Sequence, residues 1–313
     1  MTEFLTCGEA MAVLRGPGPL RLGGSLELSV AGAEANVAIG LARLGHQAGW
    51  GGRVGADELG ELIRRTLRAE GVDISGVLTD PSRPTGLMLA ERRIGDLVRV
   101  MYYRAGSAGS QLSAADVLPA LDEDVRLLHL TGITAALSPA ARECVTQVAA
   151  RTRETGTALS VDVNYRSRLW TPAEARQALL PLVSRADIVF GSTDELAMLA
   201  GHSDPAVAAR EILARGAGQV VVKRGADGAT AHAAGASFSA QAKPVPVVDV
   251  VGAGDAFVAG YLSAYLDGET IEQCLERATV TAAFGISRRG DWEGLPTRAE
   301  LSLLDLPEGT TVR

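Results

Sequence analysis

The second half of the sequence alternates short apolar runs with helical patterns, and this rhythm restricts the possible folds more than any other feature. Continuous runs rich in Val, Leu and Ile occupy residues 127–130, 158–163, 187–190 and 219–223. Runs without polar alternation are typical of strands buried on both faces. Helical patterns follow near 139–154 and 172–185, and Thr193 is expected to cap a further helix. Strands joined by helices imply right-handed parallel crossovers, so the sequence predicts an α/β fold with a doubly wound, mostly parallel sheet.

The first hundred residues do not follow this rhythm. Helices are predicted at 34–44 and 57–70, and the segments 15–30 and 86–104 are rich in β-forming residues. Within the second segment, two apolar runs flank a polar turn at Gly95 and Asp96, which indicates a hairpin. We therefore expect a small antiparallel β lid over a ligand cleft, built from about 12–31 and 86–104. A chain of 313 residues can hold the lid and the α/β body in a single domain, 1–313.

The composition argues against several classes of partner. The net charge is −7 and Lys and Arg form no cluster, so neither nucleic acid nor an anionic membrane is expected to bind. The three cysteines are far apart in the sequence and build neither a disulfide framework nor a zinc motif. No run of 18 apolar residues could span a bilayer, and the N-terminus carries Glu3 where a signal peptide needs basic residues. The sequence thus predicts a cytoplasmic protein.

The segment 249–255 carries the clearest chemical signal. Residues 245–248 are expected to be extended, and a helix is predicted from Ala256 onward. Between them, Gly252 and Gly254 let backbone N–H groups converge on one anion, and the helix dipole adds about half a positive charge. A bound phosphate repels a carboxylate placed beside it, so an acid at this position needs a functional reason. Asp255 therefore makes sense as a base that takes a proton from an attacking hydroxyl, a role worth roughly 10²–10⁴-fold in rate.

The same residues also allow a plainer interpretation, in which the glycines serve close packing and Asp255 only complements the helix dipole. Other phosphate-binding and catalytic motifs are absent, namely GxxxxGK[ST], a complete GxGxxG, HExxH, HRD and GxSxG. A dehydrogenase would have only the α/β pattern in its favour, because the dinucleotide fingerprint is missing.

Two longer strings resemble the signatures of one family. Residues 249–257, Asp-Val-Val-Gly-Ala-Gly-Asp-Ala-Phe, resemble the C-terminal signature of the ribokinase-like (PfkB) carbohydrate kinases, and residues 31–38, Ala-Gly-Ala-Glu-Ala-Asn-Val-Ala, resemble the N-terminal one. The resemblance covers nearly the whole chain. It implies a ribokinase-like body with a β lid, and transfer of the γ-phosphoryl group of ATP, bound with Mg²⁺, to a sugar hydroxyl. It makes Asp255 the catalytic base, with Gly252, Ala253 and Gly254 beside the transferred phosphate.

Within that family the chain most resembles the 2-keto-3-deoxygluconate kinases, which phosphorylate the 6-hydroxyl of a 2-keto acid. The similar strings lie at 102–104, 106–110, 128–133, 162–166 and 289–291. A substrate carboxylate needs charge-assisted donors, and Arg104 and Arg166 could each supply a planar fork that a neutral sugar would leave unpaired. Each arginine also has a plainer interpretation: Arg104 could be solvated beside its Gly/Ser loop, and Arg166 could pair with a neighbouring acid.

The resemblance implies further contacts with the sugar acid. Gly32 and Asn36 form the floor of the pocket, and Asp291 accepts hydrogen bonds from hydroxyls. Tyr102 contacts the substrate and Ile133 offers a backbone contact. Asn36 could instead only cap its helix, and of the adjacent tyrosines at 102 and 103 only one should face the cleft.

A second set of residues is placed at ATP. Lys223 ends a predicted strand and is followed by Gly225 and Gly228, at the end of the strand where open α/β sheets bind ligands. These glycines allow a tight turn near the ribose and phosphates, although a plain turn into the next strand would use them as well. Ser192 is placed with the nucleotide-binding residues, and Glu195 is carried over as an indirect helper for Mg²⁺ and its waters.

Four positions depart from the family pattern. Met88 stands where a tyrosine often covers the sugar, and Ala31 replaces a more usual glycine. Val250 stands where threonine is common, which puts activation by a monovalent cation in doubt. Ser192 replaces an asparagine, so only Glu195 of that motif is carried over.

Two functional alternatives stay open. A kinase of the same fold could act on fructose, another hexose or another 2-keto-3-deoxy sugar acid, and a sugar-sensing protein could keep the fold without turnover. The two arginines favour an acid, and Asp255 with both of its glycines favours an enzyme. An exposed apolar lid usually needs a partner, so a homo-oligomer, a dimer or larger, is expected through 15–30 and 86–104.

Overall fold

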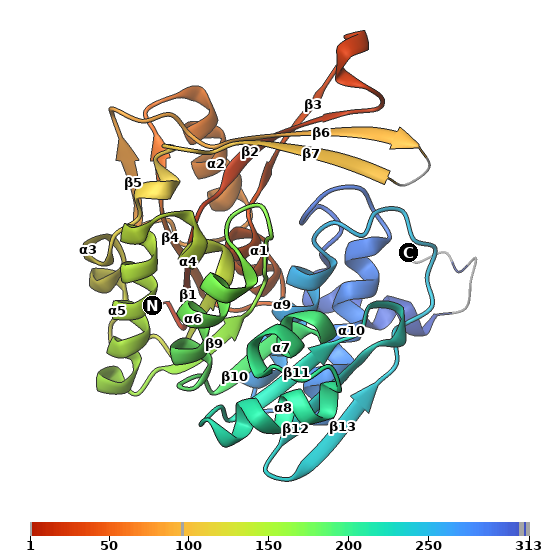
Figure 1. Ribbon diagram of the computed structural model, residues 1–313. Helices are drawn as coiled ribbons and strands as arrows, with labels where there is room; N and C mark the ends of the chain where they lie inside the picture. The colour runs from red at the N-terminus through yellow and green to blue at the C-terminus, as the bar shows by residue number, and fades with distance from the viewer. Residues whose placement is uncertain (1, 95–96, 307–309, 311–313) are drawn as a thin grey trace.

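The central sheet has the predicted doubly wound, mostly parallel arrangement (Figure 1). The computed structural model describes residues 2–94, 97–306 and 310. Within them the main sheet has nine strands in the order β13-β12-β11-β10-β9-β8-β1-β4-β5. The strands from β11 across to β5 run parallel, and β12 and β13 are antiparallel additions at one edge. Their bounds are β1 (Phe4–Cys7), β4 (Ala48–Gly55), β5 (Val77–Asp80), β8 (Leu127–Thr131), β9 (Ala158–Asp162), β10 (Ile188–Ser192), β11 (Gln219–Lys223), β12 (Ala229–Ala233) and β13 (Ala236–Ala240).

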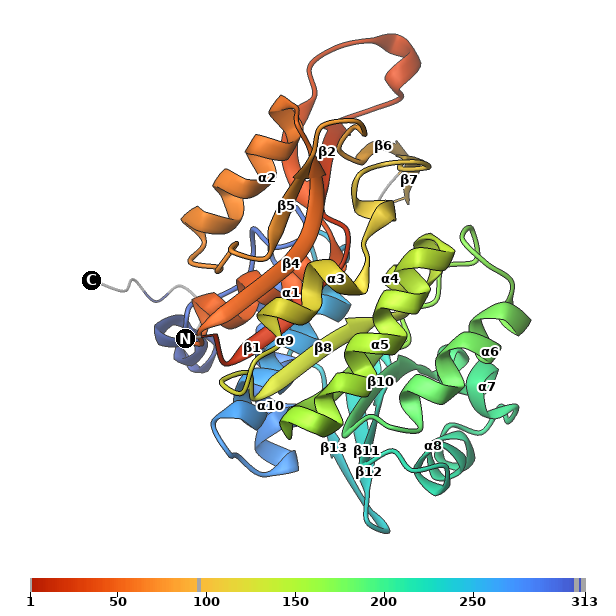
Figure 2. The ribbon, with the colours of Figure 1, turned by 90° about the vertical axis from the view of Figure 1, so that its left-hand side faces the viewer.

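Helices cover both faces of this sheet, because successive side chains in a strand point to opposite sides. Phe4 belongs to one hydrophobic core and its neighbour Leu5 to the other, and Ile188 and Val189 divide in the same way. Figure 2 shows α4 and α5 on the near side of the sheet, with α9 and α10 behind it. The first core includes α1 (Ala33–Arg43), α2 (Glu58–Ala69), α9 (Ala253–Leu266) and α10 (Ile271–Ile286). The second includes α3 (Ala114–Val117), α4 (Gly132–Leu137), α5 (Pro139–Thr155), α6 (Pro172–Val183), α7 (Thr193–Ala200) and α8 (Pro205–Ala214).

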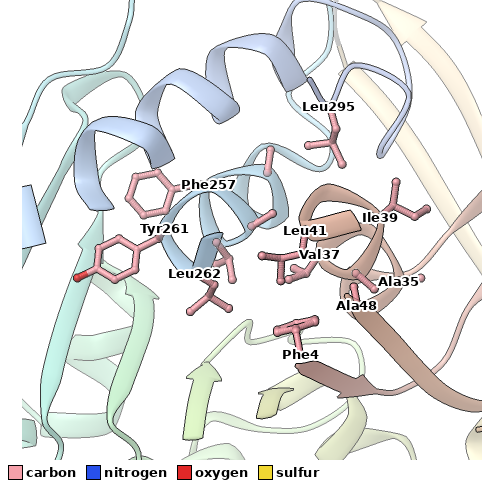
Figure 3. Packing of buried hydrophobic residues seen from close by; sticks show 14 of the residues in the cluster. Phe4, Ala35, Val37, Ile39, Leu41, Ala48, Phe257, Tyr261, Leu262 and Leu295 are labelled. Carbon is pink, nitrogen blue, oxygen red and sulfur yellow. The ribbon is translucent and has the colours of Figure 1, made fainter. Parts of the chain in front are cut away.

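The packing of α1 on α9 positions the later site (Figure 3). Apolar side chains of the two helices, among them Val37, Leu41 and Leu262, meet above Phe4 of β1. Gly40 brings the helix axes close together, since a Cβ added to it would lie only 2.6 Å from the Cβ of Ala259. Helices that touch through small residues are held in a fixed relation by close packing. The N-terminal ends of α1 and α9 are therefore adjacent.

The lid is a separate four-stranded sheet that stands above the body in Figure 1. Its order is β3 (Glu27–Ala31), β2 (Met11–Gly16), β6 (Leu87–Ile94) and β7 (Leu97–Tyr103). The outer pairs β2–β3 and β6–β7 are antiparallel as predicted, whereas the central pair β2–β6 is parallel, because the chain passes through the body between them. The predicted turn at Gly95 and Asp96 lies outside the described residues.

Three local predictions were wrong. The N-cap of α7 is Ser192 and not Thr193, because Ser192 forms a capping box with Glu195. The helix that carries Asp255 begins at Ala253, not Ala256, with Gly252 as its N-cap. Residues 245–248 form no strand. The backbone N–H of Val248 instead donates to the carbonyl of Ile286 at the end of α10.

The remaining short elements are 3-10 helices: η1 (Leu20–Leu22), η2 (Gly109–Gln111), η3 (Leu118–Ala120), η4 (Gly225–Asp227) and η5 (Arg298–Asp305). Among the residues that the structure describes, no helix combines the length and the hydrophobicity needed to cross a bilayer.

Candidate active site

A cavity of about 920 Å³ is lined by the lid on one side and by the body on the other. It brings together residues that are far apart in the sequence, because the N-terminal ends of α1 and α9 and the ends of β9 and β11 open into it. The predicted site residues that line it are Gly32, Asn36, Tyr102, Arg104, Ile133, Arg166, Ser192, Glu195, Lys223, Gly252, Gly254, Asp255 and Asp291. Ala253, Gly225 and Gly228 do not line it.

The start of α9 forms an anion-binding turn at the cavity wall. Gly252 has a φ of 74° and makes no side-chain capping bond. A Cβ added to it would lie 2.0 Å from the carbonyl oxygen of Asp291, so only glycine fits here. The uncapped N-terminus of a 14-residue helix directs backbone N–H groups and the positive end of the dipole into the cavity. The turn can therefore hold a phosphate.

Asp255 lies in the first turn of α9, and Nδ2 of Asn36 donates to its Oδ2 at 2.7 Å. Burial raises the pKa of Asp255 to about 7, and the nearby Asp162 and Asp291 carboxylates add to the effect, while the Asn36 hydrogen bond and Lys223 oppose it. A carboxyl that titrates near neutrality can accept a proton from a hydroxyl. Among the described residues, no hydrogen bond to Oδ1 of Asp255 occurs, so this oxygen is open to a ligand.

Lys223 brings positive charge to the same turn. Its Nζ donates to Oδ2 of Asp162 at 2.6 Å and lies 3.6 Å from the position that a Cβ on Gly254 would take. Although burial works against the charged form, the carboxylates of Asp162 and Glu195 raise the pKa of Lys223. The other oxygen of Asp162, Oδ1, is buried without a hydrogen-bond partner. The sequence did not single out Asp162 as a charged residue of the site, although it ends a buried strand there.

On the lid side of the cavity, Arg104 is not solvated, and its side chain is 12% exposed. Its Nε and Nη2 lie 2.6 and 2.5 Å from Oε2 of Glu9, and its guanidinium stands over the ring of Tyr102 at 5.5 Å from the centroid. Tyr102 lines the cavity, whereas Tyr103 is 60% exposed and does not, which agrees with the expected alternation. Glu9 was missed by sequence reasoning. The available signal was an acid just beyond the carboxyl end of the first strand, where α/β sheets bind ligands.

Arg166 differs from Arg104. It is exposed, lines the cavity and donates to the carbonyl of its neighbour Tyr165, at 3.2 Å. No acid pairs with it in the described part of the chain. Its charge is therefore available to an anionic ligand.

Asp291 is partly buried against the lid, with a side chain 10% exposed. Arg15 of β2 forms an ion pair with its carboxylate and also approaches Glu293 at 3.7 Å. Burial raises the pKa of Asp291 to about 6 even though Arg15 favours the ionised form. Arg15 was also missed, because its contact with Asp291 joins residues 276 positions apart.

The floor of the cavity is built around the start of α1. A Cβ added to Gly32 would lie 2.7 Å from the carbonyl oxygen of Glu9. Glu34 accepts hydrogen bonds at Oε1 from Thr131 and Thr134, each at 2.5 Å, and so ties α1 to the start of α4 beside Ile133. Burial raises the pKa of Glu34 in spite of these bonds. The floor is rigid because two helix starts share one buried carboxyl.

The family model of the pfkB family carbohydrate kinases matches residues 1–298. The chain belongs to this family. It is 37% identical to the 2-dehydro-3-deoxygluconokinase of Bacillus subtilis over 96% of this chain and 94% of that protein. It is 33% identical to the 2-dehydro-3-deoxygalactonokinase of Haloferax volcanii over 92% of each. A solved structure of a putative ribokinase II from E. coli, in complex with ATP and Mg²⁺, is 28% identical with a TM-score of 0.91, over 97% of this chain and 99% of that one.

In this pfkB family kinase, Glu195 is tied to the backbone. Its Oε1 accepts from the N–H of Tyr165 and its Oε2 from the N–H of Ser192, both at 2.7 Å. Both oxygens are thus engaged, which leaves Glu195 better suited to hold a water than to bind a metal directly. Within the described residues, no group of three or more His, Cys, Asp or Glu side chains could hold a metal ion.

Gly225 of this kinase begins η4 and Gly228 caps its end, in the turn that leads from β11 into β12, with φ of 58° and 77°. They follow Lys223 at the same end of the sheet but stand apart from the main cavity. Met88, the departure from the family pattern, does line the cavity and packs on Val13 and Ala31 inside the lid.

Proposed function

We propose that this pfkB family member transfers the γ-phosphoryl group of ATP to the 6-hydroxyl of 2-keto-3-deoxygluconate. The position of Asp255 carries the proposal. Its carboxyl has a pKa of about 7 and stands beside an anion-binding helix start in a cavity of about 920 Å³. A base and a phosphate cradle placed side by side suit phosphoryl transfer to an alcohol.

In the proposed reaction, Asp255 takes the proton of the 6-hydroxyl while that oxygen forms a bond to the γ-phosphorus and the bond to the ADP oxygen breaks. The turn from Gly252 to Gly254, with Lys223 beside it, offsets the negative charge that spreads over the transferred group. Glu195 would hold a water of the Mg²⁺ that accompanies ATP, and that ion would offset charge on the phosphates. Asn36 holds Asp255 with Oδ1 toward the hydroxyl.

The arginines support an acidic acceptor. Arg166 has no acid beside it in the described residues, and Arg104 keeps donors on the side away from Glu9. Either guanidinium can bind a carboxylate through two N–H groups. The relative from B. subtilis, named for the gluconate compound, agrees with this acceptor. We place Asp291, Tyr102, Gly32 and the backbone of Ile133 at its keto and hydroxyl groups.

A second acceptor is favoured by one observation. Met88 offers no hydrogen bond where it lines the cavity, so the lid has one less polar contact with which to distinguish epimers. The galactonate epimer, for which the relative from H. volcanii is named, is the resulting alternative. Fructose is less favoured, because it would leave Arg166 unpaired.

For the nucleotide we propose that the triphosphate lies between Gly254 and Lys223 and that the ribose reaches Gly225 and Gly228, with Ser192 at the near edge. We further propose a cytoplasmic enzyme whose single domain pairs with a second copy through the lid. Apolar side chains on the lid support this pairing: Leu22, Leu26, Leu28, Ile94, Leu97 and Tyr103 are all at least 41% exposed.

The test is ADP release with Mg-ATP across 2-keto-3-deoxygluconate, its galactonate epimer, fructose and ribose. We expect the highest kcat/KM on the gluconate compound. Turnover on fructose or ribose alone would refute the acidic acceptor, but it would still support the kinase activity. Absence of turnover on every sugar, with binding retained, would favour a sugar-sensing protein.

A further inference from the structure

Glu9 is a carboxylate buried in the wall of the cavity, only 2% exposed. Its Oε2 accepts from Nε and Nη2 of Arg104 at 2.6 and 2.5 Å, and its Oε1 accepts from the hydroxyl of Ser107. Both oxygens are thus occupied by donors from the loop that follows β7. Glu9 itself stands just beyond β1 in the body, so it fastens the acceptor side of the lid to the sheet.

The surroundings of Glu9 are shaped to hold it in one position. A Cβ added to Gly109 would lie 2.4 Å from Cγ of Glu9, and one added to Gly86 would lie 2.7 Å from its Oε1. These glycines come from two segments of the chain, before β6 and in η2. Close packing on both sides leaves the carboxylate no second orientation.

Arg104 is held equally firmly, and its side chain is 12% exposed. A guanidinium has five N–H donors in one plane. Glu9 takes the edge formed by Nε and Nη2, and the ring of Tyr102 lies under the face, 5.5 Å from the guanidinium carbon to the ring centroid. The donors that remain, on Nη1 and the outer side of Nη2, are the ones left for the cavity.

We propose that Glu9 is a positioning residue that sets the acceptor specificity of this enzyme by presenting the free edge of Arg104 to the substrate carboxylate. The proposal rests on the proposed acidic acceptor. A buried guanidinium without its partner would turn toward solvent or toward another acid, since an unpaired buried charge is strongly disfavoured. Glu9 therefore orders Arg104 before the substrate arrives, and preordering of this kind favours binding.

The main test is Glu9→Gln, which keeps the size of the side chain and removes its charge. We expect KM for 2-keto-3-deoxygluconate to rise roughly 10- to 100-fold, the range for losing a hydrogen bond to a charged group. The value of kcat should change much less, because Asp255 is untouched. In an Arg104→Ala background, Glu9→Gln should add little further loss, because Glu9 acts through Arg104.

Glu91→Gln is the matched control. Glu91 is 4% exposed, accepts from the N–H of Leu20 at 2.7 Å and lies 3.3 Å from Arg93, but it does not line the cavity. Like Glu9→Gln, this substitution removes the charge of a buried carboxylate that faces an arginine. In Glu91→Gln we expect the acceptor KM to stay within twofold of the parent value, which is about the error of comparing independent substitutions.

Three results would overturn the proposal: a lower KM in Glu9→Gln, which would mean that Glu9 competes with the substrate for Arg104; an equal rise in Glu91→Gln; or additive losses in the Arg104→Ala background. If Glu9→Gln does not fold, Ser107→Ala loosens Glu9 more gently and should raise the same KM severalfold.

The wild-type substrate panel separates this proposal from the proposed function. If the wild type uses only a neutral sugar, the acidic acceptor fails and the specificity role of Glu9 fails with it. If only the proposal for Glu9 is wrong, the wild type turns over the acid, but the effects of Glu9→Gln and Arg104→Ala on KM are independent of each other.

Discussion

The two sides of the cavity are built in different ways. The phosphate side consists of helix starts: α9 begins at a glycine turn, and Asn36 reaches Asp255 from α1, which is packed closely on α9. The acceptor side consists of ion pairs between distant segments, Arg104 with Glu9 and Arg15 with Asp291. Under the proposed function, the chemistry depends on local backbone geometry, whereas the choice of acceptor depends on contacts across the lid.

The comparison predicts its largest effect at Asp255. In Asp255→Asn the amide cannot take a proton, so we expect kcat to fall by roughly 10²–10⁴-fold or more, with acceptor binding retained. Steady-state kinetics give kcat, and calorimetry gives the affinity for the acceptor. The matched control is Asp194→Asn, which removes another first-turn acid, from α7, outside the cavity.

If Asp255 served only the helix dipole, both substitutions would have the same small effect. Activity of Asp255→Asn within a few-fold of the parent would therefore exclude a catalytic base on the phosphate side.

On the acceptor side, Arg166→Ala should raise KM for an acidic acceptor by roughly 10- to 100-fold and leave KM for a neutral sugar nearly unchanged. The reason is that Arg166 carries the charge that no acid offsets in the described residues. Competition assays with the acid and a neutral analogue measure this split. Arg185→Ala, an exposed arginine outside the cavity, is the control. An equal change for acid and neutral ligands would argue against carboxylate binding by Arg166.

The ionisation of Asp255 gives a test of the contact between α1 and α9. A base must be deprotonated, so kcat/KM should rise with pH and level off above the pKa of about 7. The Asn36 hydrogen bond lowers that pKa, so Asn36→Ala should move the midpoint of the pH profile to higher pH. Below pH 7, kcat/KM should then fall, by up to about tenfold if the midpoint rises by one pH unit. A midpoint that stays in place or falls would show that Asn36 does not hold the base.

The same contrast explains what the sequence could predict. Residues 219–223 and 158–163 were predicted as strands because a buried parallel strand is apolar throughout, and this is a local property. The helix start that carries Asp255 could be predicted for the same reason, since two glycines before an acid are a local pattern. The role of Asp255 as a base stays a prediction. The partner Asn36 needed the second family string, 31–38, because its contact with Asp255 joins α1 to α9.

The partners of Glu9 and Arg15 could not be predicted in this way. Glu9 meets Arg104 at a separation of 95 residues and Arg15 meets Asp291 at 276, and no periodicity in the sequence encodes such contacts. The parallel pairing of β2 with β6 is hidden for the same reason, since it depends on the path of the chain through the body. Where the function depends on pairs of charges that fold together from distant segments, the sequence shows only the individual charges.

The smallest predicted effect concerns the second ion pair. In Arg15→Ala, Asp291 loses the cation that favours its ionised form, so its pKa should rise further above about 6 and its carboxylate should bind hydroxyls less well near neutral pH. We expect the acceptor KM to rise about three- to tenfold, and less at pH 8 than at pH 6, because Asp291 ionises again at high pH. Arg43→Ala is the control. Arg43 stacks on Trp292 and donates to the carbonyl of Leu295, so its loss loosens the same loop without changing the charge that Asp291 faces. If the acceptor KM rises in both variants without pH dependence, Arg15 serves only the structure of the lid. Binding of the acceptor would then depend on the pair of Glu9 and Arg104.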